Sequence, residues 1–292
     1  MLRLIAKRLI AAIPSLFGVV VITFILTRAL PGDPAAYFAG GAATAEAIEQ
    51  VRKQLGLDRS LPEQFLRYLA DLARGELGLS LTTGQSVATE IAQRLPASLE
   101  IVLVALIVAC GIAVPLGVLA AVRQGSWIDQ LCRVITTAGV SLPTFFTGLL
   151  LAYVFYFLLG WAPSPLGRLD PMFSPPPAIT GFLLIDSLIA REGAVWWAAA
   201  RQMMLPVATM AIFVLAPIAR MTRASMLGVL SSDFIRTARA SGLTPTTVLF
   251  AYALRNALLP VITTLGMVFG FMLGGSVRSE EHTSELQPRV DI

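Results

Sequence analysis

The chain has 292 residues, of which 56% are hydrophobic and only 14% are charged. A soluble domain carries nearer a quarter of charged residues, so this composition excludes an ordinary soluble protein and indicates a lipid bilayer as the solvent. The net charge of +4 comes from basic residues beside apolar runs, without a basic stripe, so no nucleic acid partner is expected.

Five segments are long and apolar enough to be membrane helices, since about 20 apolar residues cross the hydrocarbon core. They are Leu9–Leu30, Leu99–Val122, Val134–Leu159, Met203–Met221 and Ala257–Val277. The first follows basic residues, as a secretory signal does, but its apolar run is too long and no clean cleavage site follows. We therefore predict an all-α polytopic membrane protein in which residues 1–30 form a retained N-terminal transmembrane helix.

The distribution of Lys and Arg predicts the orientation, because membrane proteins concentrate both residues in short cytoplasmic loops. The basic residues near the ends of the spans are Arg3, Lys7, Arg8, Arg123, Arg133, Arg220, Arg223, Arg236, Arg239 and Arg255. The same segments contain only Asp129 and Asp233 as acidic residues. We therefore expect the N-terminus and Phe234–Leu254 in the cytoplasm, and Pro31–Ala97 and Gly160–Gln202 outside.

The first outer segment, residues 31–97, should contain short helices at the membrane rim and is too small for a catalytic domain. Thr44 can cap a helix that ends at Gly56, and Pro62 suits the first turn of a second helix that ends before Gly75. The other outer segment carries Pro163, Pro165, Pro171, Pro175, Pro176 and Pro177. These prolines exclude a regular helix there.

Small residues recur every four positions in two spans, which lets helices approach closely in lipid. They are Ala105, Ala109, Ala113, Gly117 and Ala121 in the second span, and Gly266, Gly270 and Gly274 in the fifth. The pattern predicts a packed bundle, and it leaves open whether these faces line a pore instead.

The sequence shows no pattern typical of a catalytic, metal-binding or nucleotide-binding site. Arg28, Glu100 and Arg220 lie at the ends of spans, where long side chains reach the membrane surface, and no span carries a charge at its centre. The two lysines, Lys7 and Lys53, belong to no phosphate-binding loop. One histidine and two separate cysteines do not form a usual zinc site. We predict no catalytic residue, no metal and no cofactor, and hence no enzyme.

Five stretches together resemble one protein family, the ABC importer permeases of the peptide/nickel type. They are the opening LRLIAKRLIAAIPSLFGVVVITFILTRALPGDP, Gly75–Ser80, Arg94–Glu100, Asp233–Leu243 and Leu254–Pro260. Each match alone is weak, but five in the same order, spread from Met1 to Val277, are specific. The resemblance implies a type I permease helix bundle, with 98–277 as the ABC transmembrane type-1 domain.

The resemblance also implies partners and a location. The chain would be a multi-pass protein of the bacterial cytoplasmic (inner) membrane that pairs with a second, similar permease subunit. Two cytoplasmic ATP-binding subunits would supply the energy, and an extracytoplasmic substrate-binding protein would deliver the solute. Substrates in this family include dipeptides, oligopeptides, glutathione, nickel complexes and some sugars, and the sequence does not choose among them.

By the same resemblance, one cytoplasmic segment contacts the ATPase. It corresponds to the EAA loop of these permeases and comprises Arg236, Thr237, Ala238, Arg239, Ala240, Ser241, Gly242 and Leu243; we call it the coupling segment. Arg236-Thr237-Ala238 stand where the general signature has Glu-Ala-Ala, a departure typical of the peptide subgroup. We expect a short helix over Phe234–Ser241, a positive φ at Gly242 and a new turn from Pro245.

The last fifteen residues differ from the rest. Arg278–Gln287 resembles the translation of a common sequencing-library adapter, so we interpret 278–292 as an artefactual tail. Five spans are then present and a sixth, expected from the resemblance, is missing. Two alternatives to an ATP-driven importer have less support in the sequence. An ion-gradient-driven secondary transporter would need ionisable residues at the centres of its spans, and these spans have none. An intramembrane hydrolase would need a nucleophile or metal-binding motif within a span, and no span contains one.

Overall fold

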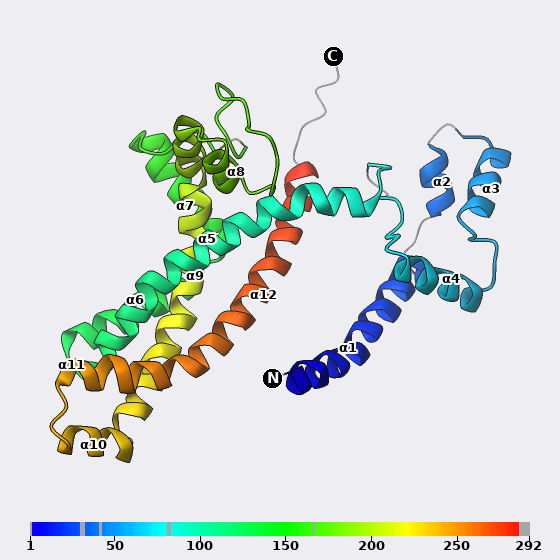
Figure 1. Cartoon of the computed structure of the whole chain (residues 1–292). Helices are drawn as coiled ribbons and strands as arrows, with labels where there is room; N and C mark the ends of the chain where they lie inside the picture. The colour runs from blue at the N-terminus through cyan, green and yellow to red at the C-terminus, as the bar shows by residue number, and fades with distance from the viewer. Residues whose placement is uncertain (1, 30–32, 41–42, 81–82, 166, 286–292) are drawn as a thin grey trace. The chain divides into compact units, whose positions relative to one another are not determined.

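A computed structural model describes residues 2–29, 33–40, 43–80, 83–165 and 167–285 of the chain (Figure 1). The chain divides into two compact units, Met1–Ala92 and Gln93–Ile292. The regular elements of the described residues are helices, as the composition predicted. Two predicted features lie partly outside the described residues. They are the Leu30–Pro34 motif, whose first residue also ends the first predicted span, and the predicted tail, at residues 286–292.

The first unit consists of a long helix followed by three short ones: α1 (Leu2–Ala29), α2 (Pro34–Ala39), α3 (Ala45–Gln54) and α4 (Leu61–Ala73). The predicted helix signals are confirmed. The Thr44 hydroxyl accepts the Ala47 amide at the start of α3, and Gly56 follows that helix with φ +66°. Pro62 lies in the first turn of α4. Phe24 of α1 packs in the unit's small aromatic cluster against Phe65 and Tyr68 of α4.

The second unit begins at Gln93, within α5, and is a bundle centred on one helix. The elements in chain order are α5 (Val87–Val122), α6 (Trp127–Ser141), α7 (Thr144–Leu151), the π-helix η1 (Ala152–Leu158), α8 (Leu183–Ile189), α9 (Gly193–Leu230), α10 (Asp233–Ala240), α11 (Pro245–Thr247), the π-helix η2 (Val248–Leu254) and α12 (Arg255–Glu285). Helix α9 contacts α6, α7, α8 and α12 and is therefore the centre of this unit.

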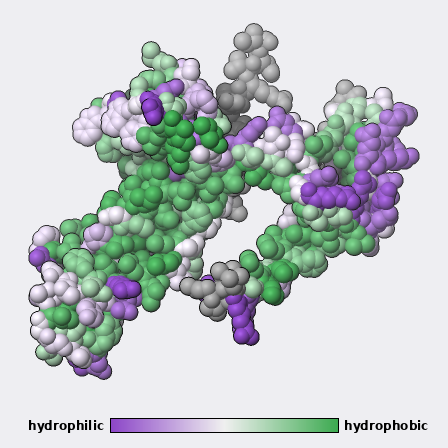
Figure 2. Space-filling view, viewed as in Figure 1, coloured by the Kyte–Doolittle hydropathy of each residue, from purple (hydrophilic) through white to green (hydrophobic). Residues whose placement is uncertain are grey.

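Among the described residues, four helices are long and apolar enough to cross a membrane: α1, α5, α9, and the stretch Pro245–Gly274 that ends in α12. Figure 2 shows apolar side chains along the long helices, as lipid contact requires. The third predicted span, Val134–Leu159, is interrupted: Trp127–Gly139 and Thr144–Leu158 are bent by 100°, and the bent pair, counted as one span, would be a fifth. The cause is Pro143, which disfavours helical geometry at the preceding residue; Leu142 is extended, with ψ 135°.

The helices also extend beyond the predicted spans. Helix α5 begins at Val87 and α9 at Gly193, so the predicted outer loop Gly160–Gln202 is shorter than expected. Its proline-rich part contains no helix in its described residues before Leu183, as predicted. Helix α12 continues through residue 285. The interpretation of 278–292 as artefactual and the domain limits 31–97 and 98–277 stay predictions.

The first stripe of small residues packs as expected. Ala105, Ala109 and Ala113 are fully buried in a core shared with α9, and the Cα of Gly117 lies so close to α9 that a Cβ there would be 2.7 Å from the Ala219 carbonyl oxygen. The glycines of α12 differ, since a Cβ at Gly266 would meet no described atom within 4 Å. Within the second unit, that stripe faces no other described residue.

Candidate functional site

The coupling segment begins on α10 and continues three residues beyond its end at Ala240. Helix α10 is amphipathic and is anchored by two side chains. Ile235 is fully buried and Ala238 is 6% exposed, in a core that contains Met226 of α9 and Val118 of α5. The remaining residues of the segment are exposed or, like Leu243, at the limit of exposure. The structure therefore separates the predicted site into a buried anchor, Ala238, and an outer face of seven residues.

The end of α10 is fixed by hydrogen bonds. The Gly242 amide donates to the Arg239 carbonyl at 3.1 Å, and the Leu243 amide donates to the Ala238 carbonyl at 3.4 Å. This pair of bonds is the Schellman motif, which requires a left-handed residue after the helix. Gly242 supplies it with φ +77°, as the sequence predicted, and a Cβ there would meet nothing within 4 Å. Only the backbone conformation demands glycine at this position.

A second turn connects the coupling segment to the last long helix. The Thr244 hydroxyl accepts the Thr247 amide, and Pro245 begins α11, as expected. The chain then passes through η2 into α12 without a break. Val248 and Ala253 of η2 are buried in the same core as Ile235. Helix α10 is thus joined to α9 on one side and to α12 on the other.

Beside this core lies an ion cluster that the sequence analysis missed. Asp129 of α6 is fully buried and accepts two hydrogen bonds from Arg223 of α9, from Nε at 2.6 Å and Nη2 at 2.8 Å. Arg133 and the Gly125 amide also donate to this carboxylate, at 3.2 and 3.0 Å. The two-bond geometry of an Arg–carboxylate pair fixes both side chains, so the cluster ties α6 to α9.

A second buried carboxylate corrects the expectation for Glu100. Glu100 is only 3% exposed inside α5, so it does not reach toward the membrane surface. Arg168 donates to it at 2.7 Å, and the Leu183 and Leu184 amides at the start of α8 donate at 3.1 and 2.7 Å. Arg168 also donates to the Gly181 carbonyl. Glu100 therefore holds the loop before α8 against α5.

Asp186 holds the same loop from its other side. Its carboxylate accepts hydrogen bonds from the Thr180 amide and hydroxyl and from the Gly181 amide, at 2.7 to 3.0 Å. Burial opposes ionisation of Asp186, but these hydrogen bonds outweigh it and lower the pKa of the carboxyl. A Cβ at Gly181 would lie 2.8 Å from the Pro96 ring, so the loop contacts α5 closely.

The described residues contain no group of three His, Cys, Asp or Glu side chains that could hold a metal ion. The site consists of an exposed helix on a buried anchor, with ion pairs that join the neighbouring helices. Residues 113–280 of the chain match a protein-family model described as "binding-protein-dependent transport system inner membrane component". The model of the N-terminal part of the same family matches residues 1–102.

The chain belongs to this family of inner membrane transport components.

Several curated relatives match nearly the whole of this chain. It is 45% identical to the probable D,D-dipeptide transport system permease protein DdpB of Escherichia coli (strain K12), over 90% of this chain and 77% of the relative. It is 44% identical to the di/tripeptide transport system permease protein DppB of Pseudomonas aeruginosa, over 96% of this chain and 83% of the relative. It is 40% identical to the glutathione transport system permease protein GsiC of Escherichia coli O6:H1, over 96% of this chain and 82% of the relative.

These matches confirm the predicted resemblance to ABC importer permeases of the peptide/nickel type. The protein is a multi-pass inner membrane transport component, and its relatives are permease subunits, which lack an ATPase site of their own. The five predicted motifs were sufficient for this assignment. The Asp129 and Glu100 clusters were missed because their partners, Arg223 and Arg168, are 94 and 68 residues away in the sequence.

Proposed function

We propose that this permease is the membrane-spanning subunit of an ATP-driven importer, and that its coupling segment docks onto a cytoplasmic ATPase subunit. The observation that carries the proposal is the form of α10. Ile235 and Ala238 hold the helix against α9 and α5, while Arg236 and Arg239 remain exposed. A helix held in this way can receive a force from a partner and pass it to the bundle.

The path of that force follows the contacts of α10. Its anchor lies in the same core as Met226 of α9, and η2 connects it to α12. Movement of the docked segments would therefore shift α9 and α12 together and open the bundle to alternate sides of the membrane. ATP binding in two partner ATPases would drive the movement, and a second permease subunit would complete the pathway.

The orientation and the outer partner belong to the same proposal. The basic residues of the coupling segment favour a cytoplasmic position, which also places the N-terminus in the cytoplasm. The outer loops then face an extracytoplasmic substrate-binding protein. The relatives named above transport dipeptides, di/tripeptides and glutathione, so we propose peptides or related small solutes as the substrate.

Gly242 provides the test. Gly242→Val forces a β-branched residue into the left-handed region, at a cost of about 2 kcal/mol, and should disrupt the end of α10. Gly242→Asn is the matched control, because asparagine tolerates this conformation. Both variants are expressed with the neighbouring transport subunits, and peptide uptake and co-purification of the ATPase are measured from the same membranes.

We expect Gly242→Val to insert normally but to lose most uptake and ATPase co-purification, while Gly242→Asn retains both. Normal uptake and co-purification in Gly242→Val would remove the coupling role. Uptake in proteoliposomes that needs an ion gradient and no ATP would instead support a secondary transporter.

A further inference from the structure

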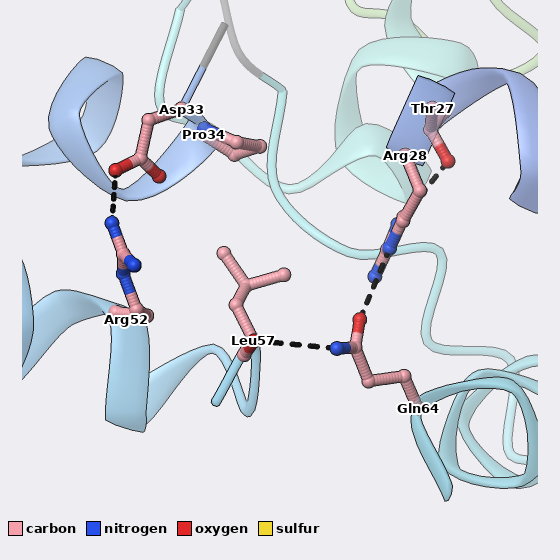
Figure 3. Close-up of a pocket in the computed structure, with 7 residues that line it drawn as sticks. All are labelled: Thr27, Arg28, Asp33, Pro34, Arg52, Leu57 and Gln64. Atoms are coloured by element: carbon pink, nitrogen blue, oxygen red, sulfur yellow. Dashed lines mark hydrogen bonds and ion pairs between the residues drawn. The ribbon is translucent and has the colours of Figure 1, made fainter. Parts of the chain in front are cut away.

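The first unit contains a cavity outside the coupling segment and the two ion clusters described above. It has a volume of about 310 Å³ and lies between the end of α1 and the short helices α2, α3 and α4 (Figure 3). Its polar wall is formed by Thr27, Arg28, Asp33, Arg52 and Gln64. Two guanidinium groups and one carboxylate therefore line the cavity, which gives the wall a net positive charge.

One arginine of the wall is already paired. Arg52 and Asp33 form an ion pair on one side of the cavity, and the Asp33 carboxylate also accepts the Ala35 amide at 3.0 Å. The Nε of Arg52 is buried and makes no hydrogen bond within the described residues; Glu49 lies 3.6 Å from it. The carboxylate charge of Asp33 is thus compensated by Arg52.

Arg28 has no carboxylate partner among the described residues. Its Nε donates to the Gln64 side-chain oxygen at 3.3 Å, its Nη1 donates to the Thr27 hydroxyl at 3.2 Å, and its guanidinium carbon lies 4.8 Å from the centre of the Phe24 ring. Gln64 is itself held, because its amide nitrogen donates to the Leu57 and Arg59 carbonyls. The Arg28 side chain is exposed, is oriented toward Gln64 and Thr27 at the wall of the cavity (Figure 3), and contacts no carboxylate of the first unit's described residues.

We propose that this cavity binds the phosphate group of an anionic compound, with Arg28 as its main ligand and Arg52 as a second donor. The planar guanidinium matches phosphate oxygens in pairs, and its charge is permanent. The volume is at the lower end for a small-molecule site, so it suits a headgroup or a small soluble phosphate and not a whole lipid.

The position of the cavity favours a lipid headgroup as the source of the phosphate. Arg28 is the last residue of the candidate span Ala6–Arg28, of which only 6% is buried in this chain. Within the first unit, side chains of this span such as Leu16 and Ile25 are more than half exposed, and an apolar span of this length is suited to lipid. The acyl chains of a phospholipid can lie along α1 while its phosphate enters the cavity beside Arg28.

The test uses the full chain purified in detergent, with phosphatidylglycerol and phosphatidylcholine of identical acyl chains as probes. Bound lipid is counted by native mass spectrometry at graded concentrations. We compare Arg28→Gln with Arg59→Gln, whose arginine belongs to the same unit but pairs with Glu63 and does not line the cavity. Arg28→Lys keeps the charge and removes the planar fork. Thermal unfolding of each variant confirms that it is folded.

We expect one phosphatidylglycerol per chain to bind about tenfold more tightly than phosphatidylcholine, a factor that corresponds to about 1.4 kcal/mol. Arg28→Gln should abolish this preference, Arg28→Lys should keep part of it, and Arg59→Gln should keep all of it. Competition by millimolar glycerol phosphate would identify a soluble phosphate as the ligand, and its absence would identify the lipid. A chain that binds neither probe preferentially, or an equal loss in Arg59→Gln, would overturn the proposal.

Discussion

The Asp129–Arg223 pair should be among the strongest single polar contributions to the stability of the bundle. Asp129 is fully buried, and its two hydrogen bonds to Arg223 measure 2.6 and 2.8 Å. Breaking a buried pair by removing one partner costs about 3–5 kcal/mol, because the other charge stays buried without compensation. The Arg223 side chain retains 21% exposure, so water can solvate it in part. We therefore expect Asp129→Ala to lower the free energy of unfolding by about 3 kcal/mol, the lower end of that range.

A double-mutant cycle measures the pair itself. The variants are Asp129→Ala, Arg223→Ala and both together, and the free energy of unfolding is obtained by titrating SDS into detergent micelles. We expect a coupling energy of about 2 kcal/mol. The control is the pair Asp233–Arg236, which joins the same residue types at 3.2 Å but is exposed by 95% and 74%. That pair should couple by less than about 0.5 kcal/mol. An equally small coupling for Asp129–Arg223 would refute the reasoning, since it would show that water compensates the charges.

Three further predictions concern the backbone and the loop before α8. Gly117→Val should block the packing of α5 on α9 and lower the thermal midpoint of the purified chain, because a Cβ there lies 2.7 Å from both the Ala219 oxygen and the Thr222 Cβ. Arg191→Gly should raise the free energy of unfolding by about 1 kcal/mol, since Arg191 is held at φ 58°; an unchanged value would contradict this. Asp186, whose pKa is lowered, contributes stability that is present above the unfolded pKa of about 4 and is lost as the pH falls below it. Asp186→Asn should therefore flatten the acid limb of a stability–pH profile, and an unchanged acid limb would contradict the assignment.

The sequence predicted the features that depend on neighbouring residues. Thr44 and Gly56 delimit α3, and Gly242 ends α10 with a positive φ, because caps and left-handed turns are properties of a few consecutive residues. The span limits were less accurate. Hydropathy shows where a chain can contact lipid, but α5 and α9 continue as helices outside that region.

The break at Pro143 was predictable in principle and was missed. The apolar character of Val134–Leu159 continues across the proline, so hydropathy alone joined α6 to α7. Proline is tolerated within other helices of this chain, at Pro96 and Pro206 for example, so its presence alone does not decide. At Pro143 the preceding residue adopts an extended conformation, and the chain turns by 100°.

Glu100 and Asp129 show where reasoning from the sequence must fail. Each looked like an ordinary charge near the end of an apolar segment, and each is instead buried with an arginine from a distant element. No local pattern connects Glu100 with Arg168, because the loop that carries Arg168 reaches α5 only in the folded unit. Buried charges of this kind are identified by their partners, and partners are a property of the fold.

The coupling segment that the sequence predicted and the ion cluster that it missed are both attached to the same part of α9. Arg223 and Met226 are separated by three positions on α9 and therefore lie on neighbouring parts of its surface. Arg223 binds Asp129 of α6, while Met226 packs in the core that anchors α10 through Ile235. A displacement of α10 consequently acts on the part of α9 that is tied to α6 by two short hydrogen bonds. In the proposed importer, α6 and α9 would then move together when the ATPase pulls on α10, and loss of Asp129 would reduce uptake even where the ATPase still docks.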